Sequence, residues 1–362
     1  MPALSLVHWY TQHPSKPSPP PLERLSHVTL IGNGNVALDV ARVLLTSPSV
    51  LSKYDVPGPV LDVLSRSAVK HVSIVARRGP LEAAFATKEL REMMNLPEAS
   101  MVPIEPSLLT PSPNVSLTRQ QSRILQLLQK GSKNLPGNTE KTWSLEFFRS
   151  PTRLTGPSPS SSPAQLTLAH TSLDPTTLRA IPTGETSTLP TSLVITSLGF
   201  HGEPTAPFYD PALKHLRTIS GRIVSASGTT VKNVYSSGWA ATGAKGVLAA
   251  TMINAYAVAD TVLSDWMPKN GAASITPVSL PLEQGVVEDG VEGVTMNPNP
   301  HPEDPPPEIR DGLKEGLVTE YGDWKAVDAE EVRRGEVMGK ERERMGWEEA
   351  RMFLAQSRTR GS

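Results

Sequence analysis

Residues 31–39, IGNGNVALD, decide the fold class of this chain. They follow a short apolar run, VTLI at 28–31, and lead into helix-patterned residues 36–45, so a G-x-G-x-x-A pattern stands between a strand and a helix. In that setting the first glycine permits the tight turn, the second lets a diphosphate approach the backbone, and the alanine lets the helix pack closely on the strand. The stretch predicts a unit that binds a dinucleotide at the positive end of the helix. The alternative is an ordinary glycine turn before a helix.

A second strand indicates which dinucleotide is bound. Residues 72–76, VSIVA, have the pattern of a buried parallel strand, and Arg77 and Arg78 follow it directly. An acidic residue at this strand end suits the ribose hydroxyl of NAD, whereas arginines suit the 2′-phosphate of NADP. Arg77 lies much farther from Gly32 than the roughly 20 residues of a simple βαβ unit, so residues 47–70 must form an elaborated connection. The alternative is a solvated basic strand end.

Composition limits the remaining possibilities. A chain of 362 residues provides for about two domains, and its net charge of −1 gives no reason to expect nucleic acid binding. Because cysteine is absent, the chain has no disulfide, no redox-active cysteine pair and no cysteine-ligated cluster of its own. No apolar run reaches the roughly 18 residues of a membrane span. Proline clusters at 14–21 and 297–307 predict extended linkers, and residues 150–163 have the composition of a mobile loop.

Several later segments have a readable period. Residues 80–96 predict one helix, which carries Glu89 and Arg91, and residues 117–130 predict another. Charges on such helices are most simply solvated faces. Residues 142–149 alternate in polarity, which favours an edge strand, and residues 193–198 have the pattern of a buried strand.

A second glycine-bearing cluster, YSSGWAATGAKGVL at 235–248, again leads into a helix-patterned run that extends to Trp266. Backbone N–H groups at Gly246 to Leu248 could receive an anion or an electron-rich ring edge, and Trp239 would present a flat apolar surface beside them. This pattern indicates a second ligand site. A glycine loop that only packs a helix is the alternative.

Together these segments resemble the NADPH:adrenodoxin (ferredoxin) oxidoreductase family. The resemblance runs almost from end to end, through VHWYTQHP (7–14), IGNGNVALDVARVLL (31–45), VARRGPLEAAFATKELREM (75–93), LEFFRSP (145–151), LPTSLVITSLGF (189–200), SSGWAATGAKGVLAATM (236–252) and DWKAVDAEEVRRGEVMGKERER (323–344). It implies an α/β fold in which a Rossmann-like NADP domain is inserted in a FAD-binding domain of the glutathione-reductase-like, two-dinucleotide-domain type. Residues 1–25 would be a remnant of the FAD domain or a linker, 26–189 the NADP domain, and 190–362 the C-terminal half of the FAD domain with a proline-rich insert at 285–307.

The resemblance also implies roles for individual residues. The expected activity is electron transfer from NADPH through FAD to a small acidic iron–sulfur ferredoxin. Asp39 would be a carboxylate near the flavin that helps to handle a proton. The other implied contacts are Asn33, Gly34, Asn35 and Val36 for the NADP diphosphate, Arg77 and Arg78 for its 2′-phosphate, Glu89 for a further NADP contact, Trp239, Gly246, Val247 and Leu248 for FAD, and Arg91, Arg119 and Arg123 for the ferredoxin.

One departure from the family pattern is large. The family has a FAD-binding βαβ unit with its own glycine motif before the NADP domain, whereas only about 25 residues precede the fingerprint here. We therefore expect weak flavin binding or none, and we expect the 193–198 strand and the helix after Gly246 to lack partners. The alternative function is a non-catalytic NADP-binding fragment that cannot hold FAD.

Location and assembly rest on the resemblance alone. It implies the matrix side of the mitochondrial inner membrane, with peripheral membrane association, and a monomer. The N-terminal residues show neither a secretory signal nor a clear transit peptide, and they read like the middle of a protein.

Overall fold

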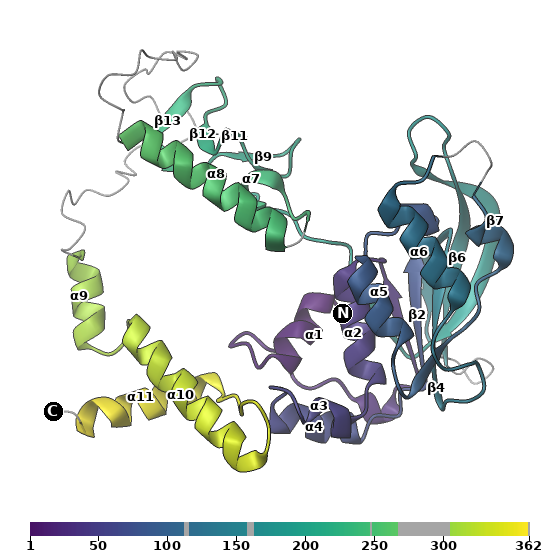
Figure 1. Cartoon of the computed structure of the whole chain (residues 1–362), viewed down its shortest axis with the longest axis horizontal. Coiled ribbons are helices and arrows are strands. Elements are labelled where there is room, and N and C mark those ends of the chain that lie inside the picture. The colour runs from purple at the N-terminus through teal and green to yellow at the C-terminus, as the bar shows by residue number, and fades with distance from the viewer. Residues whose placement is uncertain (112–115, 158–162, 247, 267–304, 361–362) are drawn as a thin grey trace. The chain divides into compact units, whose positions relative to one another are not determined.

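The computed structural model describes residues 1–111, 116–157, 163–246, 248–266 and 305–360 (Figure 1). The chain divides into two compact units, one of Met1–Leu198 with Pro307–Ser362 and the other of Gly199–Pro306. The glycine turn belongs to the first unit. The domain boundaries expected from the sequence stay a prediction, and most of the proline-rich insert at 285–307 lies outside the described residues.

A five-stranded parallel sheet forms the centre of the first unit, with strand order β3-β4-β2-β1-β8. The apolar, β-branched runs form its inner strands, as the sequence predicts. The strands are β1 (His27–Ile31), β2 (His71–Ala76), β3 (Ala99–Met101), β4 (Lys141–Phe147) and β8 (Leu193–Thr196). The helices of the same region are α1 (Ala3–Tyr10), α2 (Asn35–Leu45), α3 (Pro48–Leu51), α4 (Gly58–Ser65), α5 (Thr87–Met94) and α6 (Arg119–Lys130).

Strand β1 is the point at which the strand order reverses. Its neighbour on one side is β2, which follows it in sequence, and its neighbour on the other side is β8, which returns from far along the chain. In open α/β sheets, ligands bind in the crevice beyond the carboxyl ends of the strands at such a point. The fold therefore places the glycine turn where a dinucleotide is expected.

Two strand expectations are wrong. The 193–198 segment does not lack a partner, because Val28 to Ile31 pair with Leu193 to Thr196 in parallel register. The segment expected as an edge strand, now β4, lies between β3 and β2. Its alternation arises because its two faces contact different layers: Trp143 and Leu145 belong to the main core, whereas Ser144 faces the opposite side.

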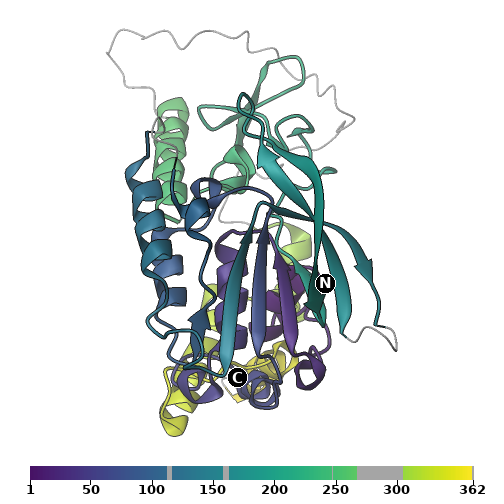
Figure 2. The ribbon, with the colours of Figure 1, turned by 90° about the vertical axis from the view of Figure 1, so that its right-hand side faces the viewer.

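The two faces of the sheet are covered by different structures (Figure 2). Helices α2, α5 and α6 pack their apolar residues, such as Leu38, Leu90 and Leu125, into the main core with Leu30 and Ile74. On the other face lies a three-stranded antiparallel sheet of β5 (Arg149–Thr155), β6 (Ala164–Leu173) and β7 (Ala180–Thr191), whose Leu166 and Leu168 pack against Ile31 and Val75. The loop expected at 150–163 is therefore wrong for residues 150–155, which form most of β5.

A polar cluster lies on the antiparallel-sheet side near the start of β2. The His71 ring hydrogen-bonds Thr142 Oγ1 at 2.7 Å and Ser73 Oγ at 3.0 Å. Burial, and after it the neighbouring His27, lowers the pKa of His71 to about 4. The folded state therefore holds this imidazole neutral.

The helices near the strand ends differ in part from expectation. Residues 117–130 do form a helix, α6, which Thr118 caps by accepting a hydrogen bond from Gln121 N at 3.2 Å. Residues 80–96 do not form one continuous helix, because a 3-10 turn, η2 (Pro80–Glu82), is separated from α5. The intervening backbone makes a tertiary contact instead, in which Ala86 N donates to Asn35 Oδ1 at 2.7 Å. Two further 3-10 turns are η1 (Leu22–Arg24) and η3 (Pro106–Leu109).

The second unit contains short strands and one long helix. A glycine turn at Gly221 approaches α8 so closely that an added Cβ would lie 2.6 Å from Val258 Cγ2. Arg222 and Tyr235 both bond Asp265, which ties the strands to the end of the helix. The elements are β9 (Tyr209–Asp210), β10 (His215–Leu216), β11 (Thr218–Ile219), β12 (Arg222–Val224), β13 (Thr230–Tyr235), α7 (Trp239–Thr242) and α8 (Leu248–Trp266).

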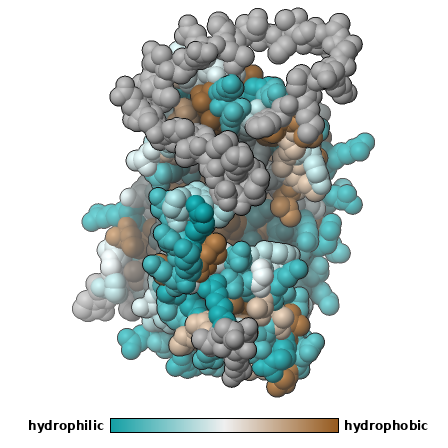
Figure 3. Space-filling model, turned by 90° about the vertical axis from the view of Figure 1, so that its left-hand side faces the viewer, coloured by the Kyte–Doolittle hydropathy of each residue, from teal (hydrophilic) through white to brown (hydrophobic). Residues whose placement is uncertain are grey.

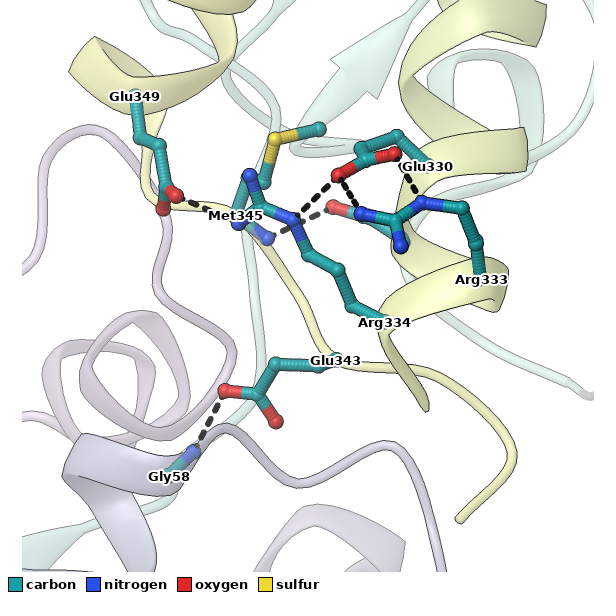
Figure 4. Close-up of polar contacts among 8 residues, drawn as sticks. Gly58, Glu330, Arg333, Arg334, Glu343, Met345 and Glu349 are labelled. Atoms are coloured by element: carbon teal, nitrogen blue, oxygen red, sulfur yellow. Dashed lines mark hydrogen bonds and ion pairs between the residues drawn. The ribbon is translucent and has the colours of Figure 1, made fainter. Parts of the chain in front are cut away.

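Three C-terminal helices, α9 (Pro307–Lys314), α10 (Tyr321–Met338) and α11 (Trp347–Arg360), complete the first unit. Figure 4 shows polar contacts within α10 and between α10 and α11: Glu330 bonds Arg333 and Arg334, and Arg334 bonds Glu349 on α11. The segment after α10 is joined to the start of α4, since Glu343 Oε1 accepts from Gly58 N at 3.0 Å.

The same segment carries a buried ion pair. Lys340, whose side chain is only 5% exposed, pairs with Glu343 and donates to Val56 O at 2.9 Å.

In Figure 3 hydrophilic side chains cover much of the face that the figure presents, with hydrophobic ones scattered among them. In the part of the chain that the structure describes, we find no helix with the length and apolar character of a membrane span.

Candidate dinucleotide site

The site begins with the turn that joins β1 to α2. Gly32 has φ of +116°, a left-handed conformation that favours glycine, and its N–H donates to Val75 O at 2.9 Å. A Cβ at Gly32 would lie 2.1 Å from Ser197 O, so the turn passes directly against the end of β8. Glycine is therefore needed at position 32 for the turn itself and because the backbone at Ser197 lies against it.

Gly34 serves a different purpose. It is the N-cap of α2 with φ of −92° and ψ of 177°, an extended conformation open to any residue. No atom lies within 4 Å of the position that its Cβ would occupy. The space in front of the helix is therefore open, and the first N–H groups of α2, at Asn35 and Val36, have no intrahelical acceptor. An anion placed there would meet these donors and the positive end of the helix.

The two asparagines of the turn differ. Asn33 Nδ2 is buried and has no hydrogen-bond partner among the described residues. An unpaired buried donor costs free energy unless a ligand accepts from it, so this amide fits a diphosphate oxygen. Asn35 instead uses its side-chain oxygen to hold Ala86 N, which fixes the loop before α5 against the start of α2.

Arg77 and Arg78 follow the carboxyl end of β2, directly beside the glycine turn of β1. Their backbone is held in place, because Arg77 O accepts from Thr171 Oγ1 at 2.8 Å and Arg78 O accepts from Phe148 N at 3.2 Å. Neither guanidinium makes an ion pair with any described residue, and the Arg77 side chain is exposed. A pair of unengaged guanidinium groups on a fixed backbone matches the charge and geometry of a phosphate monoester.

Asp39 and Glu89 lie on α2 and α5, two helices that pack against each other. Asp39 is on the second turn of α2, Glu89 is on the first turn of α5, and both contact Arg42. Nearby on α1, burial, and after it the charge of Asp39, raises the pKa of Tyr10 to about 12. The fold thus gathers carboxylates from two helices around one guanidinium, which the sequence did not indicate because Arg42 carries no motif of its own.

The three arginines expected to face a protein partner lie on two neighbouring helices. Arg91 lies on α5 and Arg119 and Arg123 lie on α6, two helices that pack against each other. All three side chains are exposed and none is in an ion pair with another described residue. Exposed, unpaired arginines on neighbouring helices suit an acidic partner, and that role stays a prediction.

The expected flavin contacts lie in the second unit. Trp239 opens α7, is 49% exposed and stacks on Phe200 with ring centroids 6.2 Å apart. Gly246 has φ of +85° and precedes α8, whose first residue, Leu248, is 85% exposed. Val247 lies outside the described residues. An exposed indole, an exposed leucine and a glycine loop at a helix start are residue types that suit contact with a flat aromatic cofactor, and this assignment stays a prediction.

The described residues of the two units suit two different cofactors. The first unit offers an open helix start, an unpaired buried amide and two unengaged arginines, which suit the diphosphate and 2′-phosphate of NADP. The second unit carries the exposed Trp239 and Leu248 and the glycine turn at Gly246, and the flavin contact expected there stays a prediction. Within the described ranges no group of three or more His, Asp or Glu side chains is arranged to hold a metal ion.

This chain is similar in sequence and structure to several known proteins. No family model matches the chain. The mitochondrial NADPH:adrenodoxin oxidoreductases of rat and human are each 33% identical to it over 357 residues, covering 95% of this chain and 66% of each relative. The NADPH-ferredoxin reductase FprA of Mycobacterium tuberculosis is 30% identical, covering 94% of this chain and 70% of that protein. The solved structure of that FprA in complex with NADPH matches with a TM-score of 0.73 at 26% identity, over 98% of this chain and 73% of the other. The chain thus spans 66% of the length of the mammalian relatives.

Proposed function

The chain belongs to the NADPH:adrenodoxin oxidoreductase family, and from this premise we propose that it acts in electron transfer from NADPH, through FAD, to a small acidic iron–sulfur ferredoxin. The observation that carries the proposal is the NADP site. An open helix start and an unpaired Asn33 amide lie at the switch point of the sheet, beside two unengaged arginines. The relatives' names give the reductase reaction and the ferredoxin class of acceptor.

In this proposal the first unit binds NADPH. Asn33, Gly34 and Val36 receive the diphosphate, and Arg77 and Arg78 hold the 2′-phosphate. Asn35 contributes through the backbone that it fixes, and Glu89 accepts from a hydroxyl or amide of the nucleotide. The domain division that we propose keeps residues 26–189 as the NADP-binding part.

The second unit would hold the flavin through Trp239, Gly246, Val247 and Leu248. A bound flavin supplies the conversion of a two-electron hydride into single electrons, which side chains cannot supply. Asp39 would help to handle a proton in the reaction. Arg91, Arg119 and Arg123 would steer the acidic ferredoxin by their charge, an effect that salt weakens. We further propose a mitochondrial location, by analogy with the mammalian relatives.

The first experiment measures binding of NADP⁺ and NAD⁺ to the purified protein by calorimetry. We expect NADP⁺ to be preferred, and the double variant Arg77→Ala/Arg78→Ala to weaken NADP⁺ binding by about 100-fold while NAD⁺ binding changes little. The reason is that two charge-assisted contacts to the 2′-phosphate are worth about 1.5 kcal/mol or more each. The exposed pair Arg153→Ala/Arg179→Ala removes the same charge elsewhere and should leave both affinities unchanged.

The second experiment adds FAD and records the visible spectrum before and after anaerobic NADPH. A bound flavin band that bleaches supports the reductase. Saturable NADP⁺ binding without any bound flavin would instead favour the alternative, a non-catalytic NADP-binding protein. Equal affinity for NADP⁺ and NAD⁺ would contradict the proposed site itself.

A further inference from the structure

Arg42 is the centre of an ion cluster that joins helices α2 and α5. Its guanidinium contacts Asp39 on the preceding turn of α2, Glu89 Oε2 at 3.2 Å, and Glu92 on the next turn of α5. Three carboxylates from two helices thus converge on one cation. The Arg42 side chain is only 25% exposed, so water screens these contacts incompletely.

The three carboxylates depend on Arg42 to different degrees. Glu92 has a second cation, Lys88, at 3.9 Å. Asp39 and Glu89 have no cation other than Arg42 among the described residues. The Glu89 side chain is also the least exposed of the three, at 20%. Without Arg42, Glu89 would face two like charges, and its carboxylate would turn away from them toward water.

We propose that Arg42 is a positioning residue for the nicotinamide dinucleotide: held by Asp39, it fixes the Glu89 carboxylate where that group accepts a hydrogen bond from the nucleotide. This inference rests on the proposed NADP site and deepens it. Arg42 acts on the nucleotide through Glu89, which it contacts directly. A lysine cannot replace it, because an ammonium lacks the planar fork that spans carboxylates on two helices.

The chemistry of Glu89 gives the inference a distinctive signature. A carboxylate only accepts hydrogen bonds, and it repels a phosphate, so its nucleotide partner is a ribose hydroxyl or the carboxamide. These groups are common to NADP⁺ and NAD⁺. Loss of Arg42 must therefore weaken both ligands by the same factor, whereas loss of Arg77 and Arg78 weakens NADP⁺ alone.

The test compares Arg42→Gln, Arg42→Lys and Glu92→Gln by calorimetric titration with NADP⁺ and NAD⁺, and by thermal melting. We expect Arg42→Gln to raise both dissociation constants about tenfold with an unchanged ratio, and Arg42→Lys to restore little of the loss. Glu92→Gln removes another ion pair of the same guanidinium and should leave both constants within about twofold. Loss of affinity that follows only the melting temperature, equally in Arg42→Gln and Glu92→Gln, would overturn the inference.

A double variant tests the route of the effect. If Arg42 acts through Glu89, then Arg42→Gln/Glu89→Ala binds no more weakly than Glu89→Ala alone, because the group to be positioned is already gone. Full additivity, or full rescue by Arg42→Lys, would show a direct charge effect and refute the positioning role. Failure of the wild-type protein to prefer NADP⁺ would count against the proposed function, whereas normal wild-type binding with a neutral Arg42→Gln would count against this inference alone.

Discussion

Substitution by alanine should have different effects at the two glycines of the turn: Gly32→Ala should lower stability, and Gly34→Ala should lower NADP⁺ affinity. In Gly32→Ala the new methyl would lie 2.1 Å from Ser197 O, and the backbone would keep φ of +116°. An alanine with positive φ costs on the order of 1–3 kcal/mol. Relief of the collision requires β1 and β8 to separate by roughly an ångström, which weakens the hydrogen bond that Ser197 N donates to Ile31 O at 2.7 Å. A total loss of about 3 kcal/mol follows, as the sum of the strain and roughly one lost hydrogen bond.

Gly34→Ala provides the matched control. Its φ of −92° suits alanine, and no atom lies within 4 Å of the new methyl. The free energy of unfolding should therefore change by no more than about 0.5 kcal/mol, because the cost of alanine at an N-cap is offset by the lower conformational entropy that alanine gives the unfolded chain. The same methyl would occupy the open space before α2 that we assign to the diphosphate, so NADP⁺ affinity should fall at least about tenfold, or about 1.4 kcal/mol.

Urea unfolding and NADP⁺ titration separate the two effects. With an m-value of about 2 kcal/mol/M, Gly32→Ala should lower the urea midpoint by about 1.5 M, and Gly34→Ala should leave it nearly unchanged. A stable Gly32→Ala variant would refute the close approach between β1 and β8. A Gly34→Ala variant that binds NADP⁺ normally would show that the diphosphate does not approach this glycine.

Three further outcomes follow from named contacts. His71 is neutral in the folded state down to a pKa of about 4 but becomes charged near pH 6.5 in the unfolded chain, so stability should fall by about 3 kcal/mol as the pH drops through that window. Urea unfolding across pH should show a smaller fall in His71→Gln. Glu343→Ala should cost about 3 kcal/mol in the same assay, since it leaves the buried Lys340 ammonium unpaired, whereas Glu343→Gln keeps the backbone hydrogen bond and should cost less. Arg119→Glu/Arg123→Glu should slow reduction of an acidic ferredoxin at least about tenfold at low salt in stopped-flow measurements, with the difference shrinking as salt is added and NADP⁺ affinity unchanged.

The local parts of the site could be predicted from sequence. A glycine pattern between an apolar run and a helical run specifies a strand, a turn and a helix start, because the backbone conformation there depends on neighbouring residues only. The two arginines after β2 were found for the same reason. The helices α2, α6 and α8 begin and end within a residue or two of the expected positions, since their apolar spacing and caps are local.

Other features depend on which segments meet in space. The period of residues 142–149 indicated a strand, but only the sheet order makes it an inner one. The chain sequence gives no sign that the strand at 193–196 pairs with β1, because a parallel partner can come from anywhere in the chain. The break between η2 and α5 is likewise decided by a contact with Asn35, which lies on another element.

The sequence by itself thus determined the class of fold and the position of the glycine turn, and it predicted a preference for NADP, because all three depend on short runs of residues. Only the tertiary structure showed that residue 32 must lack a side chain because the backbone after β8 lies against it. It also showed that the side-chain amide of Asn33 is unpaired, whereas the side chain of Asn35 makes a hydrogen bond. It further showed that Arg42 contacts carboxylates on two helices. The physical reason is the distance along the chain over which each interaction acts. Turn and helix propensities act between neighbours in the chain, whereas steric contact, hydrogen bonding and charge act between whatever side chains the fold brings within a few ångströms.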